Sequence, residues 1–201
     1  MIDAPTWWSM GDKSYSPEMI TQLAKGMAQY SPTWLEEPLP PEMHEAYALL
    51  NQMNYVPIAS GEHEQTFEGF QDIIEKRAVD YVQMDVCCQG GFDMGVKVFK
   101  HTQAAGLRFA FHCWGSALEV LASAQLGICW PESLVEWLEY PCHEAPGKAG
   151  MYPFPLAEEI LKEPLEIKNG YLHVPNSPGL GIEINEKIIE KKPYIKAPWS
   201  Y

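Results

Sequence analysis

The chain has 201 residues and a formal net charge of −13, and 46% of its residues are hydrophobic while 20% are charged. This composition supplies enough apolar side chains for a globular core, which excludes a disordered or fibrous protein, and the length suits one large domain, or one domain and a fragment. With only two arginines and an acidic balance, nucleic acid is not an expected partner, and no apolar run approaches the ~20 residues of a membrane helix. Five cysteines without a C-x-x-C pattern predict reduced thiols, and a start without a signal-peptide pattern predicts a cytoplasmic protein.

Predicted helices and strands alternate along the chain. Ser16 before Pro17 and Glu18 predicts a helix start, and apolar residues at helical spacing continue this helix to about residue 30. The apolar segment 33–35 predicts a strand, which should end at Pro38 because proline cannot continue sheet pairing. The same cycle then repeats, with helices predicted near 42–51, 66–77, 91–105 and 116–125 and strands near 56–59, 81–84, 108–111 and 134–138. Such alternation predicts a parallel sheet with right-handed crossovers.

Each predicted strand ends in a polar side chain. In a parallel barrel the carboxyl ends of all strands open onto one face, so residues far apart in sequence converge there, and catalysis concentrates on that face. A single acid at a strand end is usually a solvated turn residue or a helix cap, but a succession of six favours a functional site. The six residues, 23 to 33 positions apart, are Asp3, Glu36, Glu62, Asp85, His112 and Glu139.

The order of these residues separates two kinds of chemistry. Asp3, Glu36 and Glu62 end three consecutive strands, and carboxylate oxygens without cysteine suit a hard cation such as Mg²⁺. A divalent cation would also offset the repulsion among three carboxylates. Asp85 and His112 end the next two strands, where a carboxylate next to an imidazole can fix its tautomer and strengthen its free nitrogen as a base.

Several segments together resemble the enolase superfamily and, within it, the mandelate racemase subgroup. They are Trp34-Leu35-Glu36-Glu37-Pro38, Gly61-Glu62, Asp85 with Gly90-Gly91, Gly106 leading to His112, and Pro178-Gly179-Leu180-Gly181-Ile182. Gly61-Glu62-His63-Glu64 and His112-Cys113-Trp114-Gly115 extend the resemblance to acid-sugar dehydratases. The resemblance implies Mg²⁺ bound by Asp3, Glu36 and Glu62, a catalytic His112–Asp85 pair, and a further catalytic acid at Glu139. Substrate contacts are predicted for His63, Glu64 and Trp114.

The resemblance also implies the architecture. Residues 1–150 are expected to form an incomplete TIM-type (β/α)₈ barrel of about six βα units, without the amino-terminal capping domain and the first strands of the family. Residues 151–201 are expected to form a tail that returns to the capping domain. The segment 168–174, with Asn169-Gly170 as its turn, predicts a hairpin within this tail. The full-length form is expected to be a homo-oligomer.

The implied reaction is Mg²⁺-dependent removal of the proton next to a carboxylate, with stabilisation of the resulting ene-diolate. The resemblance to acid-sugar dehydratases implies dehydration of a sugar acid, in which an acid such as His112 can help a β-hydroxyl leave as water. Two alternatives remain open. One is a racemase or cycloisomerase on the same scaffold, and the other is an inactive truncated remnant.

Overall fold

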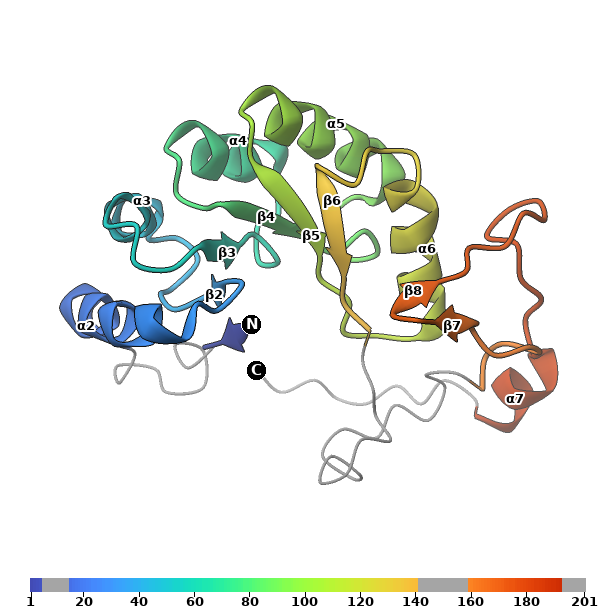
Figure 1. Ribbon diagram of the computed structural model, residues 1–201. Helices are drawn as coiled ribbons and strands as arrows, with labels where there is room; N and C mark the ends of the chain where they lie inside the picture. Colours follow the sequence, from blue (N-terminus) through green and yellow to red (C-terminus); the bar gives the residue numbers. More distant parts are fainter. Residues whose placement is uncertain (5–14, 141–158, 193–201) are drawn as a thin grey trace. The chain divides into compact units, whose positions relative to one another are not determined.

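The computed structural model of the chain describes residues 1–4, 15–140 and 159–192. A parallel sheet of six strands curls within this part of the chain, with each strand paired to the next in sequence and helices α2 to α5 on its outer side (Figure 1). The predicted partial barrel is therefore confirmed. Its strands are β1 (Ile2–Asp3), β2 (Leu35–Glu36), β3 (Ile58–Ser60), β4 (Tyr81–Met84), β5 (Arg108–Phe111) and β6 (Val135–Leu138). Its connecting helices are α2 (Pro17–Met27), followed by a 3₁₀ turn (Ala28–Tyr30), α3 (His44–Gln52), α4 (Phe67–Glu75), α5 (Gly91–Ala104) and α6 (Ala117–Gly127).

Local sequence signals explain where these elements begin. The Ser16 hydroxyl accepts a hydrogen bond from the backbone N–H of Met19 at 3.2 Å, so the predicted cap of α2 is confirmed. Strand β3 begins at Ile58, two residues later than predicted. Pro57 has no N–H to donate, although its carbonyl accepts from the backbone N–H of Leu35 at 2.8 Å.

The two faces of the sheet differ because successive strand residues point to opposite sides. Phe109 and Phe111 of β5 face the helices, where their rings meet Phe99 of α5 at centroid distances of 4.3 and 5.6 Å. The intervening Ala110 lies on the concave face and belongs to a buried cluster. Each of the strands β2, β3 and β4 contributes one further member, which lies in the strand or directly before it. The other members of this cluster are Trp34, Ala59 and Tyr81. The next side chains on the same face of β2 and β5 are Glu36 and His112.

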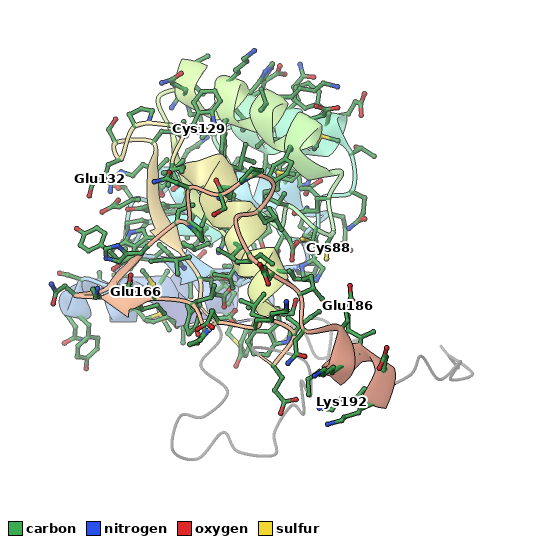
Figure 2. The ribbon with its side chains drawn as sticks, turned by 90° about the vertical axis from the view of Figure 1, so that its right-hand side faces the viewer. Cys88, Cys129, Glu132, Glu166, Glu186 and Lys192 are labelled. Atoms are coloured by element: carbon green, nitrogen blue, oxygen red, sulfur yellow. The ribbon has the colours of Figure 1, made fainter. Side chains whose placement is uncertain are left out.

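A second compact unit comprises two parts of the chain. One is Cys113–Gln125, which includes most of α6, and the other is the described part of the segment from Tyr140 onward. It contains the strands β7 (Ile167–Lys168) and β8 (Tyr171–Leu172) and the helix α7 (Glu186–Lys191), near whose ends Glu186 and Lys192 are labelled in Figure 2. The two strands form the predicted hairpin, and Asn169 and Gly170 both have positive φ, as a tight primed turn requires. An apolar cluster of Ala117, Leu121 and Leu161 joins α6 to the tail. The predicted boundary between 150 and 151 falls outside the described residues.

Two further expectations can be compared with the described residues. No disulfide joins any two of the described cysteines Cys87, Cys88, Cys113 and Cys129, while Cys142 lies outside the described part of the chain. No described helix combines the length and the apolar character that crossing a membrane requires.

Candidate active site

Backbone hydrogen bonds between neighbouring strands hold the predicted exit residues along one edge of the sheet. The N–H of Ala4, directly after Asp3, donates to the carbonyl of Glu36 at 3.0 Å. The N–H of His112 donates to the carbonyl of Met84 at 3.2 Å. The N–H of Glu139 in turn donates to the carbonyl of Phe111, also at 3.2 Å. The parallel register thus extends to the carboxyl ends of the strands, where the sequence places the functional residues.

His112 and Asp85 form the predicted pair. Nδ1 of the imidazole lies 3.2 Å from Oδ2 of Asp85, whose side chain is almost fully buried. The other carboxylate oxygen accepts hydrogen bonds from the backbone N–H groups of Cys87 and Cys88 at 2.8 and 2.9 Å. These bonds fix the Asp85 carboxylate, which in turn orients the imidazole so that Nε2 is the nitrogen able to exchange a proton.

Glu62 lies on the other side of this imidazole. Its Oε2 is 3.6 Å from Nε2 of His112. Burial alone would lower the pKa of His112, but the hydrogen bond to Asp85 and the charges of Glu62 and Glu139 outweigh it and raise this pKa to about 9. Burial raises the pKa of Glu62 to about 8 in spite of the opposing attraction of His112. A carboxylate and an imidazole with displaced pKa values in close contact are typical of sites that transfer protons.

Asp3 and Glu36 lie directly opposite each other in the register of β1 and β2. Burial raises the pKa of Asp3 to about 6, and the negative charges of Glu36 and Glu139 add to this effect. Glu36 is oriented by the indole N–H of Trp34, which donates to its Oε2 at 2.7 Å. The negative charge of Glu36 also contributes to the raised pKa of Glu62. Asp3 is exposed, and Glu36 and Glu62 are partly buried. All three offer oxygen atoms, the ligand type that a hard cation such as Mg²⁺ prefers, but the three together are not one of the described groups whose potential ligand atoms all lie within 4.8 Å of one another.

Glu37 is a site residue that the sequence reasoning missed. Its side chain is fully buried, and its backbone has a positive φ of 38°. Its carboxylate lies 2.8 Å from Nδ1 of His63 and accepts a hydrogen bond from the Ser60 hydroxyl at 3.3 Å. The contact of Nδ1 of His63 with the Glu37 carboxylate raises the pKa of His63. Glu37, Glu62 and His63 also offer potential metal-ligand atoms that all lie within 4.8 Å of one another. The only signal in the sequence was the doubled acid before Pro38.

The structure places the remaining predicted residues in different surroundings. His63 lies beside Glu62, with 3.5 Å between Nδ1 and Oε1, and its side chain is 39% exposed. Glu64 instead contacts His44 of α3 at 2.9 Å, and burial raises the pKa of its carboxyl group. Trp114 belongs to the second unit, where its backbone N–H donates to the Glu119 carboxylate at 2.9 Å. Glu139 is close enough for its charge to raise the pKa values of both Asp3 and His112.

Comparison with known protein families shows which family the chain belongs to. The family described as "Enolase C-terminal domain-like" matches residues 1–188, which is nearly the whole chain. The chain belongs to this family. Its curated relatives include a cycloisomerase and acid-sugar dehydratases, and the latter are the group that the motifs around Glu62 and His112 resembled.

Three relatives of this enolase-like chain illustrate the similarity. It is 34% identical over 187 residues to a D-galactarolactone cycloisomerase of Agrobacterium fabrum, covering 92% of this chain and 46% of the relative. It is 30% identical over 177 residues to a D-xylonate dehydratase of Haloferax volcanii, covering 88% and 40%. The crystal structure of a 3,6-anhydro-D-galactonate cycloisomerase from Zobellia galactanivorans matches with a TM-score of 0.77 and 26% identity, covering 95% and 49%. The chain therefore spans less than half the length of each relative.

Proposed function

We propose that this chain provides the acid–base and metal-binding residues for removal of the proton next to the carboxylate of a sugar acid, followed by loss of a β-hydroxyl as water. The observation that carries this proposal is the arrangement around His112, whose Nδ1 contacts Asp85 at 3.2 Å while its Nε2 lies 3.6 Å from Glu62. One imidazole nitrogen is thus occupied by a fixed carboxylate, and the other faces Glu62, one of the proposed metal ligands. This is the position that a base needs for a substrate whose carboxylate lies against the cation.

Mg²⁺ is the proposed cofactor, with Asp3, Glu36 and Glu62 as its ligands. When bound, it would supply positive charge to offset the second negative charge that proton removal places on the substrate carboxylate. The chain's own residues carry the proton transfers. Neutral His112 accepts the α-proton at Nε2, Asp85 holds the resulting imidazolium in place, and a proton from the imidazolium or from Glu139 lets the β-hydroxyl leave as water. The enol product then rearranges to a keto acid.

Cycloisomerisation is a second candidate, because two of the three relatives described above are named cycloisomerases. This reaction begins with the same proton removal but ends with a different bond change and no release of water. The products therefore distinguish the candidates. The third possibility is a remnant that has kept the strands and lost the chemistry.

The test is incubation of the chain with Mg²⁺ and a panel of sugar acids and their lactones in deuterated water, followed by proton NMR. Loss of the α-proton signal is expected for at least one compound, accompanied by a keto acid if the reaction is dehydration. A ring-opened or ring-closed isomer would identify a cycloisomerase. A chain that binds Mg²⁺ yet exchanges no α-proton in any compound would contradict the proposal, and absence of both exchange and metal binding would indicate the remnant.

A further inference from the structure

Gln89 lies in the loop between β4 and α5 and is one of the few polar side chains in the described residues that are almost fully buried, at 2% exposure. Its side chain makes three hydrogen bonds. Oε1 accepts from the backbone N–H of Asp85 at 2.6 Å, while Nε2 donates to the carbonyl of Gly61 at 2.7 Å and also to the carbonyl of Glu64. Because one partner is a donor and two are acceptors, only one orientation of the amide satisfies all three.

These bonds connect two loops that carry different parts of the candidate site. On one side, Gln89 and Asp85 are joined twice, since the backbone N–H of Gln89 also donates to the carbonyl of Asp85 at 2.9 Å. On the other side, the two carbonyls that Gln89 binds come immediately before and shortly after Glu62 in the sequence. A single side chain therefore links the residue that orients the imidazole to the backbone segment that carries the proposed metal ligand.

The loop around Glu62 has little freedom to adjust. Gly61 has a φ of +132°, and a Cβ at this position would lie 2.4 Å from the carbonyl oxygen of Gln83 on β4, so the backbone is in close contact with the neighbouring strand. The N–H of Glu64 closes a turn onto the Gly61 carbonyl at 3.0 Å. The Glu64 side chain is itself fixed by His44, at 2.9 Å. Gln89 supplies the side-chain link from this turn to the β4–α5 loop.

We propose that Gln89 is a positioning residue that sets the separation between the Glu62 carboxylate and the His112–Asp85 pair by holding the two loops together. The structural part of this proposal stands on the three hydrogen bonds alone. Its consequence for cation affinity rests on the proposed function, in which Glu62 binds the metal. A change at Gln89 should therefore act on the Glu62 turn first and on cation binding through it.

Gln89→Met and Gln89→Glu test the proposal. Methionine has a similar length but makes none of the three bonds. Glutamate can still accept from the Asp85 N–H but has at most one proton for the two carbonyls, whether ionised or not. Amide hydrogen exchange measured by NMR is expected to accelerate at least tenfold at the Glu64 N–H in both variants, and at the Asp85 N–H only in Gln89→Met. The exposed Gln103 on α5 provides the matched control, and Gln103→Met should change neither rate.

Calorimetric titration with Mn²⁺ measures cation affinity, and amide exchange in the core of β5 shows whether the variants have lost global stability. The dissociation constant is expected to rise at least tenfold in both Gln89 variants, while exchange at the Phe109 N–H in the core of β5 stays as in the unchanged chain. Acceleration at Glu64 no greater than at Phe109 would overturn the proposal, and so would an unchanged Mn²⁺ affinity despite a loosened Glu62 turn. If the unchanged chain binds no Mn²⁺, the proposed metal function fails, and the exchange rates still decide whether Gln89 holds the loops together.

Discussion

Replacing His112 with asparagine is expected to slow exchange of the substrate α-proton by at least ~10³-fold, because general acid–base catalysis by a positioned side chain contributes about 10² to 10⁴ in rate. Asparagine can keep a hydrogen bond to Asp85 but cannot accept the proton. The measurement is the initial rate of α-proton loss by NMR in deuterated water at saturating Mg²⁺. Binding of Mg²⁺ should be retained, since His112 is not one of its proposed ligands.

The pH dependence of the same rate tests the role of Asp85. As a base, His112 must be neutral, so the rate should rise with pH through the pKa of His112, which lies at about 9 without the cation and lower when positive charge is bound nearby. Asp85→Asn removes the negative charge that raises this pKa and leaves a neutral amide, whose hydrogen bond to Nδ1 is weaker and can run in either direction. The rising limb should therefore move to lower pH while the plateau rate falls, because the imidazole is no longer held in its working orientation.

His173 provides the matched control for these variants. It lies in the second unit, directly after β8, and its side chain is 53% exposed. His173→Asn is expected to leave both the rate and its pH dependence unchanged. A rate in His112→Asn within tenfold of the unchanged chain would show that another group removes the proton.

Glu62→Gln is expected to stabilise the metal-free chain at high pH and to weaken Mg²⁺ binding by at least a hundredfold. Glu62, Asp3 and His112 all have folded-state pKa values above their usual ones, at about 8, 6 and 9. Each group therefore binds protons more tightly in the folded state, and the stability it contributes is complete below its unfolded pKa and is lost as pH rises through its folded pKa. The metal-free chain should lose stability progressively between about pH 4 and pH 9.

Glu62→Gln removes the part of this loss of folding stability that comes from ionisation of Glu62. Each unit of pKa shift corresponds to about 1.4 kcal/mol, and the lost attraction between Glu62 and His112 offsets part of the gain. We expect Glu62→Gln to exceed the unchanged chain in free energy of unfolding by roughly 1–3 kcal/mol at pH 8 and to differ little at pH 4. Urea denaturation at the two pH values, with and without Mg²⁺, measures this difference.

An exposed glutamate serves as the control for the charge change itself. Glu132, labelled in Figure 2, lies in the turn before β6, and Glu132→Gln should alter neither the pH dependence nor Mg²⁺ affinity. With Mg²⁺ bound, the unchanged chain should become more stable at pH 8, and Glu62→Gln should not. Equal free energies of unfolding of the two chains at both pH values would contradict the view that ionisation of Glu62 destabilises the folded, metal-free chain.

The repeating order of strand and helix could be predicted from sequence because hydrophobic spacing and caps are local signals. Ser16 and the helix after it illustrate this, as does the exit of β5 at His112. The predicted start of β3 is two residues too early because Val56 is apolar. Backbone hydrogen bonding to the neighbouring strand starts at the carbonyl of Pro57, and the strand itself begins at Ile58. Apolar character alone does not indicate which backbone groups find a partner.

The candidate site was predictable where it depends on strand ends and not where it depends on loops. The contact of His112 with Asp85 follows from adjacent strands, and sequence reasoning anticipated it. The contact of Glu37 with His63 and the three bonds of Gln89 depend on how separate loops fold toward each other. Neither residue stands at a special position in a repeating pattern, so no sequence signal distinguished Glu37 from Glu36, or Gln89 from an ordinary turn residue.

The position of a bound cation tests the central claim most directly. Crystals of the chain grown with Mn²⁺ in place of Mg²⁺ should give an anomalous scattering peak in contact with carboxylate oxygens of Asp3, Glu36 and Glu62, and this peak should be absent from crystals of Glu62→Gln. A peak bound instead by Glu37, Glu62 and His63 would contradict the assignment of the ligands. No peak at the carboxyl ends of β1 to β3 would contradict the claim that these strands gather their acids around a divalent cation.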